Sequence, residues 1–381
     1  MQEKSHTLRI VFSVTNCICF DQRVQKMARV VSDMCTEVTI AGRKKAECCK
    51  KNIVPFKTKR FKIVFKKGFF FYMFFDIRLF FYLLFHRFDL LVANDLDTLL
   101  PNFLVSKIKK IPVVYDSHEY FTDLPEISNR KFVKFVWASI EKWIFPHLKY
   151  VLTVNDSIAN LYETKYGIRP VVVRNCSPLS SGIKALSRNE IGVNENSFIV
   201  ILQGTGINID RGAEELIRAV SEMENVTLII AGSGDVVPAL KDMTVKLKAE
   251  DRIMFIPPLP WEELMRYTKL ADAGMVLGKD TNINYRFSLP NKLFDYISAG
   301  IPVIASNLEE ITNIVTKYCC GIVLPELTSE EISDTIKILS DNKQLLLLLK
   351  ENSLKATEEL NWEKESEKVK AFYSDLIKNE F

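Results

Sequence analysis

The sequence predicts an α/β protein with two domains, each built around a parallel sheet. At 381 residues the chain is longer than one hydrophobic core usually serves, so two domains of ordinary size are expected. Short runs rich in β-branched residues alternate with helical patterns along the whole chain. This alternation is typical of βαβ units that close into parallel sheets.

The expected strands fall into two groups. The first half of the chain contains LRIVFS, EVTIA, DLLVA, VVYD, YVLTV and PVVVR. The second half contains FIVILQG, VTLIIAG, RIMFI, AGMVLG, PVIAS and GIVL. Between the groups, residues 175–197 are rich in Ser, Asn and Gly and weak in periodicity, which suits a linker. We therefore expect domains at residues 1–176 and 198–360, joined by a linker at 177–197.

The last segment, residues 361–381, has the pattern of an amphipathic helix. Its apolar positions recur roughly along one side of a helix, at Trp362, Val369, Phe372, Leu376 and Ile377. A helix with one apolar side must cover another apolar surface. We expect this helix to pack back on the N-terminal domain.

Composition indicates a folded protein that resides in the cytoplasm. Hydrophobic residues make up 48% of the chain and charged residues 26%, without a repeat of fixed period. The eight cysteines show no Cys-x-x-Cys spacing and no nearby histidine, so we expect reduced thiols. The first residues, MQEKSHTLRIVFSV, lack the basic and apolar segments of a signal peptide.

Positive charge is concentrated in one segment beside an aromatic one. The net charge is only +4, but residues 43–67 contain eleven Lys or Arg and one acid, Glu47. Residues 69–85, FFFYMFFDIRLFFYLLF, are too short to span a bilayer and include Asp76 and Arg78. A cytoplasmic enzyme that rests on an anionic membrane through residues 43–85 has these features. A buried helix beside a solvated basic loop is the alternative, and no nucleic-acid recognition motif accompanies the charge.

A glycine-rich turn follows the first strand of the second half. The segment GTGINIDRGAEELIRAV places Gly204 and Gly206 in the turn and Arg211 at the start of a helix. Glycines leave room for a ligand, free amides bind anions, and an arginine binds phosphate oxygens. Such turns also occur for geometry alone, and a second Gly-x-Gly at residues 231–235 is less specific still.

A much more specific motif lies at residues 284–306, NYRFSLPNKLFDYISAGIPVIAS. It resembles the donor-binding segment of family 4 glycosyltransferases, whose fold is GT-B, in particular bacterial members that build polysaccharides and glycans. Further matches to that family occur in order along nearly the whole chain: DQRVQKMA, VANDLDTLLP, VYDSHEYF, VNDSIANLYETKYG, DRGAEELI and the terminal NWE. The resemblance implies two Rossmann-like domains that face each other across a cleft.

The resemblance also implies how the donor is bound. Arg211 matches the basic residue that binds the nucleotide diphosphate, and Lys292 is placed as a second cation. Asp295 matches an acid that binds ribose hydroxyls, whereas Phe287 stands where a second acid is usual, so the donor sugar is unassigned. Within the same segment, Leu289, Pro290 and Asn291 are expected to begin a helix whose amides point toward phosphate. A plain intrahelical ion pair between Lys292 and Asp295 is the alternative.

Polar residues after the strands of the first half are candidates for the reaction and the acceptor. The resemblance makes His118, which follows VVYD, an active-site residue that hydrogen-bonds a sugar hydroxyl. A core histidine bonded to backbone is the alternative. Its neighbour Glu119 either orients the acceptor or stands at a helix start.

Two further segments of the first half complete the candidate site. Asn94 and Asp95 are candidates for the cleft wall, and Asp97 for the N-cap of a following helix rather than for a metal ligand. Asp21 and Arg23 follow the first strand, where related enzymes present the acceptor. Arg23 is expected to meet a lipid diphosphate or solvent.

The function expected is therefore sugar transfer with retention of configuration. The donor is a nucleotide sugar, and the acceptor is a hydroxyl of a glycan, expected to be lipid-linked, in surface polysaccharide or glycoconjugate biosynthesis. The family resemblance implies no essential metal and no cofactor, and the enzyme is expected at the inner face of the cytoplasmic membrane. Two alternatives remain: a sugar-nucleotide epimerase of the same fold, and a non-catalytic partner subunit of a membrane-associated transferase.

Overall fold

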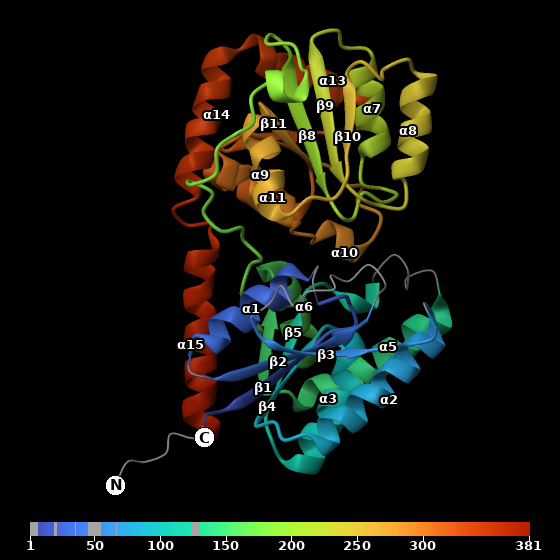
Figure 1. The fold of residues 1–381 in the computed structure, drawn as a ribbon, viewed down its shortest axis with the longest axis vertical. Coiled ribbons are helices and arrows are strands. Elements are labelled where there is room, and N and C mark those ends of the chain that lie inside the picture. The colour runs from blue at the N-terminus through green and yellow to red at the C-terminus, as the bar shows by residue number, and fades with distance from the viewer. Residues whose placement is uncertain (1–6, 19–20, 35, 45–54, 66, 124–129) are drawn as a thin grey trace. The chain divides into compact units, whose positions relative to one another are not determined.

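The protein is described from a computed structural model, which divides the chain into two compact units. The structure describes residues 7–18, 21–34, 36–44, 55–65, 67–123 and 130–381. The first unit comprises residues 1–175 together with 365–381, and the second comprises residues 176–364. Each unit contains one parallel sheet covered by helices (Figure 1).

The first unit has a seven-stranded sheet with the order β3-β2-β1-β4-β5-β6-β7. All paired neighbours are parallel. The strands are β1 (Arg9–Ser13), β2 (Glu37–Arg43), β3 (Lys57–Phe61), β4 (Leu90–Asn94), β5 (Val113–Ser117), β6 (Tyr150–Thr153) and β7 (Val171–Val172). The sequence predicts all of these except β3, which lies in the basic segment. Because β3 pairs with β2, part of this segment is an edge strand and not a solvated loop.

Helices cover the first sheet on both faces. In Figure 1, α2, α3 and α5 lie on one side of the sheet, and α1 and α15 lie on the other. The helices are α1 (Gln22–Ser32), α2 (Phe69–Phe85), α3 (Leu96–Lys109), α5 (Lys131–Ile144), α6 (Asp156–Tyr166) and α15 (Trp362–Glu380). From Glu365 onward α15 belongs to the first unit, where Val369, Tyr373 and Leu376 are buried.

The second unit has a six-stranded sheet with the order β10-β9-β8-β11-β12-β13. Its strands are β8 (Phe198–Gly204), β9 (Val226–Gly232), β10 (Ile253–Ile256), β11 (Ala273–Val276), β12 (Val303–Ser306) and β13 (Gly321–Leu324). Its helices are α7 (Ala213–Ser221), α8 (Val237–Lys246), α9 (Trp261–Leu270), α10 (Ile283–Arg286), α11 (Asn291–Ala299), α12 (Glu309–Tyr318), α13 (Ser329–Asp341) and α14 (Lys343–Ala356). Apolar clusters fill both faces of this sheet.

The strand order locates the place in each unit where ligands bind. In the first sheet the order reverses direction between β1 and β4, and in the second between β8 and β11. In open parallel sheets, ligands bind beyond the carboxyl ends of the strands at such a reversal. The loops after β1, β4 and β5, and those after β8 and β11, are therefore the ones that matter for function.

The segment predicted as a linker is held by the second unit. Ser180 donates a hydrogen bond to the carbonyl of Ser298, and Lys269 donates to the carbonyls of Ser180 and Ile183. Arg188 forms an ion pair with Asp272 at 3.0 Å. Residues 176–197 are accordingly part of the second compact unit.

Helix α2 is apolar except for Asp76 and Arg78, but only one stripe of it is buried. Phe71, Phe75, Leu79 and Leu83 form the buried stripe. Phe70, Phe74, Ile77, Phe81 and Phe85 form an exposed stripe at helical spacing. The alternative of a buried helix thus holds for one stripe, and the membrane contact of the other stripe stays a prediction. Within the described ranges, no helix combines the length and apolar character needed to cross a bilayer.

One cysteine differs from the sequence-based expectation. Cys17 is disulfide-bonded, whereas Cys176, Cys319 and Cys320 are free. The expectation that every cysteine is a reduced thiol is wrong for Cys17. Spacing along the chain did not show it, because a disulfide depends on the distance between Cα atoms in the fold.

Candidate active site

The loop after β8 is held by backbone hydrogen bonds to the loop after β9. Gly204 ends β8 with φ 139°, a conformation that favours glycine. Its carbonyl accepts a hydrogen bond from the Ser233 amide at 3.0 Å, and the Ile207 amide donates to the Ser233 carbonyl at 3.1 Å. A Cβ at Gly232 would lie 1.9 Å from the Gly204 oxygen. The Gly-x-Gly motif at residues 231–235 therefore supports the backbone of the turn that contains Gly204 and Gly206.

Arg211 is fixed at the start of α7 by an aromatic ring. Its guanidinium carbon lies 3.9 Å from the centroid of the Tyr285 ring, which α10 supplies. Gly212, the N-cap of α7, has φ 70°, and a Cβ there would meet Leu277. No carboxylate within the described part of the chain forms an ion pair with Arg211. Stacking orients the cation and leaves its donors available for an anion.

Helix α11 presents an uncapped N-terminus and a second cation. It begins at Asn291, after Pro290 as N-cap, with no side-chain cap and no acid in its first turn. Leu289 lies before the helix and not in it. Lys292 is in the first turn, and its Cε would be 4.0 Å from a Cβ placed on Gly204. Burial, reinforced by the charge of Arg211, lowers the pKa of Lys292 to about 7.

These features converge on one place at the carboxyl edge of the second sheet. The loop after β8, the start of α7 and the start of α11 bring together Gly204, Arg211 and Lys292. Gly206 lies in the same loop with open space around its Cα. Two neighbouring cations that form no ion pair among the described residues, beside a helix N-terminus without a side-chain cap, can bind a multivalent anion. Among the described residues, Lys292 and Asp295 do not form the ion pair that was the alternative interpretation.

Asp295 lies among hydrogen-bond donors of its own unit. Its Oδ1 accepts hydrogen bonds from Ser177 Oγ and from Trp261 Nε1 at 2.9 Å, and its Oδ2 accepts one from Gln203 Nε2 at 2.9 Å. Gln203 in turn accepts a bond from Thr268. The carboxylate is buried, and its three donors connect β8, α9 and α11; its expected role toward ribose hydroxyls stays a prediction.

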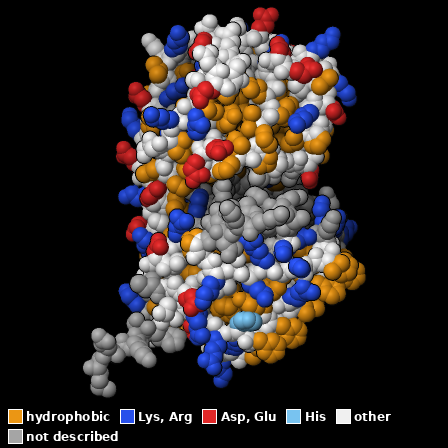
Figure 2. Space-filling view, viewed as in Figure 1, with side chains coloured by type: hydrophobic (Ala, Val, Ile, Leu, Met, Phe, Trp, Pro, Cys, Tyr) orange, Lys and Arg blue, Asp and Glu red, His pale blue; other side chains and the backbone are white. Residues whose placement is uncertain are grey.

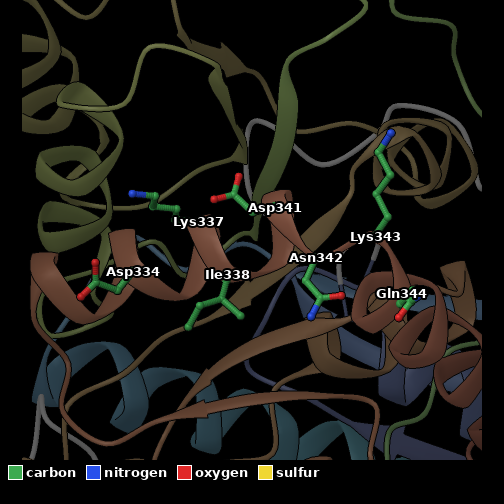
Figure 3. Close-up of a pocket in the computed structure, with 7 residues that line it drawn as sticks. All are labelled: Asp334, Lys337, Ile338, Asp341, Asn342, Lys343 and Gln344. Atoms are coloured by element: carbon green, nitrogen blue, oxygen red, sulfur yellow. The ribbon is translucent and has the colours of Figure 1, made fainter.

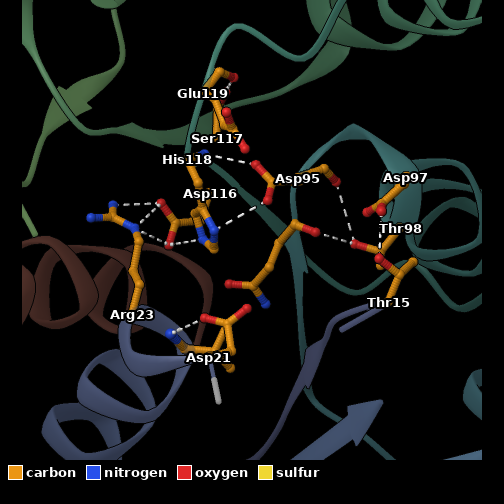
Figure 4. Close-up of polar contacts among 12 residues, drawn as sticks. Thr15, Asp21, Arg23, Asp95, Asp97, Thr98, Asp116, Ser117, His118 and Glu119 are labelled. Atoms are coloured by element: carbon orange, nitrogen blue, oxygen red, sulfur yellow. Dashed lines mark hydrogen bonds and ion pairs between the residues drawn. The ribbon is translucent and has the colours of Figure 1, made fainter. Parts of the chain in front are cut away.

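At the carboxyl edge of the first sheet, His118 lies between two carboxylates (Figure 4). Its Nδ1 is 3.1 Å from Asp95 Oδ2, and its Nε2 is 3.4 Å from Asp116 Oδ2. Burial lowers the pKa of His118, but the two carboxylates outweigh burial and hold this pKa well above the usual value. His118 is thus neither a neutral core histidine bonded only to backbone nor a ring with a nitrogen open to a sugar.

Arg23 is a buried residue, and its interpretation as an acceptor contact is corrected. Its Nε and Nη2 bind Asp116, the latter at 2.7 Å, and its Nη1 donates to the Val173 carbonyl at 2.7 Å. Only 3% of the Arg23 side chain is exposed, so neither solvent nor a lipid diphosphate reaches it. Asp116 was missed by sequence reasoning. It is the last but one residue of β5, and its position two residues before His118 was the only available signal.

The other predicted residues of the first unit surround this group. Asp21 is the N-cap of α1, where it accepts from the Val24 amide, and burial raises its pKa. Asn94 ends β4 and donates to the Ser13 carbonyl at 2.9 Å. Glu119 follows His118, and its carbonyl accepts from Ser117 Oγ. The structure therefore brings Asp21, Asn94, Asp95, His118 and Glu119 to one sheet edge.

Asp97 is not the N-cap of α3. Asp95 occupies that position, and Asp97 lies inside the first turn, buried and bonded to Thr15 Oγ1. Burial, together with the charge of Asp95, raises the pKa of Asp97 to about 8. In the described part of the chain, no group of three His, Cys, Asp or Glu side chains is placed to hold a metal ion.

Two family models match the chain in succession. The model described as Glycosyltransferase Family 4 matches residues 22–179, and the model described as Glycosyl transferases group 1 matches residues 184–356. The chain belongs to the family 4 type of glycosyltransferases. An uncharacterized glycosyltransferase of Methanocaldococcus jannaschii is 25% identical over 50% of this chain and 51% of its own length. The chain spans about half the length of the curated relatives that it matches first.

Solved structures identify the fold of this family 4 glycosyltransferase as GT-B. Sucrose-phosphate synthase of Thermosynechococcus elongatus superimposes with a TM-score of 0.82 at 15% identity, over 98% of this chain and 100% of that one. HepE of Anabaena in complex with UDP-glucose gives a TM-score of 0.76 at 16% identity, over 97% and 100%. At such identities the likeness shows the fold alone.

One pocket among the described residues lies away from this site. It has a volume of 840 Å³ and lies where α13 meets α14, lined by Asp334, Lys337, Ile338, Asp341, Asn342, Lys343 and Gln344. Figure 3 shows these side chains spread along the two helices, with Lys343 directed away from the others. None of the predicted site residues of this glycosyltransferase lines the pocket, and it lacks the convergent polar groups of a binding site.

Proposed function

We propose that the protein transfers a sugar from a nucleotide donor to a hydroxyl group, with retention of configuration and without a metal. The observation that supports this most is the seat formed by Arg211, Lys292 and the N-terminus of α11. Two neighbouring cations, one of them with a lowered pKa, favour a diphosphate over any neutral ligand. UDP-glucose, which HepE binds in its solved complex, is the first donor to test.

The chemistry follows from where charge develops. The bond between the anomeric carbon and the phosphate oxygen breaks, and a bond to the acceptor oxygen forms on the same face of the sugar. The leaving diphosphate gains negative charge, which Arg211, Lys292 and the α11 amides stabilise; one such donor is worth about 3–4 kcal/mol in preorganised sites. The acceptor proton passes to the departing phosphate oxygen, which leaves no step that requires a protein base.

Nucleotide release tests this proposal directly. Purified protein is incubated with UDP-glucose and other nucleotide sugars, with and without membrane lipid extract, and both free nucleotide and the sugar product are measured. We expect nucleotide release that depends on acceptor and is lost in Arg211→Ala. Isomerisation of the donor sugar without an acceptor would support the epimerase instead. A folded protein that releases nucleotide from no donor would fit the non-catalytic subunit.

We further propose that the acceptor is lipid-linked and that the first unit rests on an anionic membrane. The exposed stripe of α2 is extended by α5, whose Phe132, Phe135 and Trp143 are 74%, 68% and 52% exposed. Tyr72 of α2 contacts Trp137 of α5 with ring centroids 5.3 Å apart, so the two helices are neighbours. Figure 2 shows hydrophobic side chains gathered in the region of α2, with Lys and Arg side chains beside them.

The combination of aromatic residues and basic charge suits the interface of an anionic bilayer. Exposed aromatic rings partition into the headgroup region, and each nearby Lys or Arg adds about 1 kcal/mol of attraction. Lys59, Lys62 and Lys142 are exposed on β3, after β3 and on α5. Such a surface would bring the polar edge of this unit close to a lipid-borne acceptor.

Flotation with liposomes tests the membrane proposal. Phe74→Ser with Phe81→Ser should abolish binding to vesicles of anionic lipid, and Lys59, Lys62 and Lys142 changed to Gln should weaken it and reduce its salt dependence. Leu347→Ser with Leu348→Ser is the matched control, because those exposed leucines lie in the second unit. Equal flotation of all variants would contradict the proposal.

A further inference from the structure

The backbone of Asp95 is held in a conformation that ordinary residues avoid. Asp95 follows β4 with φ 61° and ψ 167°, a region populated almost only by glycine. The residue stands at the N-cap of α3, yet its side chain makes no capping bond to that helix. Such strain persists only where other contacts enforce it, and it concentrates at functional sites.

The side chain of Asp95 is instead committed to His118. Its Oδ1 accepts a hydrogen bond from the His118 backbone amide at 2.8 Å, and its Oδ2 lies 3.1 Å from Nδ1 of the ring. One carboxylate therefore fixes both the backbone and the ring of His118, as Figure 4 shows. The other ring nitrogen, Nε2, is shielded from solvent and lies 3.4 Å from Asp116 without hydrogen-bond geometry.

The pairing continues from His118 into the core of the first unit. Asp116 is fully buried and is bound by Arg23, which also donates to the Val173 carbonyl just after β7. Tyr373 of α15 is buried close enough to both Asp116 and Arg23 for their charges to act on its pKa. Asp95, His118, Asp116 and Arg23 thus alternate in sign as one row of paired charges.

We propose that Asp95 is a positioning residue, which holds His118 as a fixed imidazolium between two carboxylates at the acceptor-side edge. His118 then gives this edge a rigid cationic group and does not accept the proton of the attacking hydroxyl. The consequence for transfer rests on the proposed function. The protonation state of His118 does not, because it follows from the first unit alone.

Charged groups from every neighbouring element act on His118. Asp95 comes from α3 and Asp116 from β5, and both raise the His118 pKa, whereas burial lowers it. Asp21 at the start of α1 contributes a further acid, whose own pKa is raised by burial. Asp97 is mostly protonated at neutral pH, because its pKa is raised to about 8. Removal of the Asp95 charge should therefore lower the His118 pKa strongly, and removal of the Asp97 carboxyl, which is bonded to Thr15, should lower it less.

Nitrogen-15 NMR of histidine-labelled protein tests the proposal. The chain has four histidines, and His118→Gln assigns the signal. We expect His118 in the unaltered protein to titrate well above the usual histidine range, because Asp95 and Asp116 both face the ring. In Asp95→Asn the midpoint should fall by about one pH unit or more, since one unit is a modest effect for a contacting charge. Asn has the same shape as Asp, and its Oδ1 can still accept the hydrogen bond from the His118 amide, so this variant removes the charge and keeps that contact.

The matched control is Asp97→Asn, a change of the same residue type two positions along the chain. Its His118 midpoint should fall by less than half as much as in Asp95→Asn, because the Asp97 carboxyl is bonded to Thr15, whereas Asp95 contacts the ring. With donor and acceptor present, Asp95→Asn should lower kcat about tenfold at unchanged donor KM and should add a step to the rate–pH profile. A His118 that titrates near its ordinary pKa in the unaltered protein, or identically in Asp95→Asn, would overturn the proposal. Absence of transfer with an intact imidazolium would count against the proposed function only.

Discussion

The cationic side chains at the carboxyl edges of the two sheets differ in whether they are paired with carboxylates. In the first unit Arg23 and His118 are each bound by buried or half-buried carboxylates. In the second unit Arg211 stacks on Tyr285, and the half-buried Lys292 has a pKa that desolvation and the charge of Arg211 lower. Among the described residues, neither of these two cations forms an ion pair. The charges at the first edge neutralise each other within the fold, whereas the cations at the second edge have no acidic partner in the described part of the chain and are available to an anionic ligand.

The difference assigns separate tasks to the two edges. Paired buried charges contribute little net stability but are costly to break, so they fix geometry. Unpaired cations destabilise the folded protein until an anion arrives, so they create affinity at the expense of stability. Substitutions at the first edge should therefore reduce stability, and substitutions at the second should reduce binding.

The largest expected effect is that of Arg23→Met. The variant leaves Asp116 charged, buried and without its cation, and removal of one partner of a buried pair costs about 3–5 kcal/mol. The free energy of unfolding, measured by urea denaturation, should fall by that amount. A loss below about 1 kcal/mol, the range of a surface pair, would show that Arg23 is not a structural centre of this edge.

Arg211→Ala and Lys292→Met should have the second largest effect, on donor binding. Each should weaken the affinity for UDP by about 10- to 100-fold, as expected from loss of one charge-assisted contact to phosphate. Calorimetric titration measures this affinity, and circular dichroism should show that both variants are folded. Unchanged affinity in Arg211→Ala would remove Arg211 from the site.

Lys292→Met should also stabilise the protein in a pH-dependent way. The pKa of Lys292 is lowered to about 7 in the folded protein, from 10.5 for an unperturbed lysine. Between those pH values the unfolded chain binds more protons, so the stability of the unaltered protein rises with pH. Below pH 7 the penalty is complete, and the Met variant should be more stable by about 1–3 kcal/mol there. An equal or lower stability at pH 6 would contradict a buried, uncompensated Lys292.

Donor affinity should depend on pH for the same reason. A bound diphosphate favours the charged form of Lys292, so the pKa of this group rises on binding and a proton is taken up. Affinity for UDP should fall by about tenfold between pH 6.5 and 8.5, and this fall should disappear in Lys292→Met. If the pH profile is the same in both proteins, the pH dependence comes from a group other than Lys292.

The smallest expected effect comes from an exposed pair near the donor edge. Arg286 and Asp280 form an ion pair at 3.0 Å, with 52% and 44% of their side chains exposed. Asp280→Asn should change the free energy of unfolding by less than about 0.5 kcal/mol, because solvent screens such pairs. A larger effect would show that burial does not determine how much an ion pair contributes to the stability of this protein.

Much of the fold was predictable from the sequence, because buried parallel strands are continuous apolar runs. Strand β3, KTKRF, was missed because an edge strand with alternating Lys and Arg lacks that signal. Helix α2 was ambiguous for a physical reason. Its residues are apolar on all sides, so periodicity alone does not reveal which stripe is buried.

Site residues that lie within a sequence motif were predictable. Residues whose role depends on a partner far away in the sequence were less so. Arg211 and Lys292 were found because the glycine turn and the LPNK segment mark them. Asp116 was missed and Arg23 was misinterpreted, because their mutual bond joins residues far apart in sequence. The hydrogen bonds of Asp295 to Gln203 and Trp261 were not visible in the sequence, since these partners come from other elements. Sequence shows which groups exist but not which of them neutralise each other.

The most direct test of the account is the proton uptake that accompanies nucleotide binding. UDP is titrated calorimetrically at pH 7 in two buffers of different ionisation enthalpy, for the unaltered protein and for Lys292→Met. We predict that the unaltered protein takes up about half a proton more than the variant, as expected for a group with a pKa of about 7 that becomes charged. Equal uptake in both proteins, with equal affinity, would contradict the claim that the second edge holds its cations ready for a diphosphate.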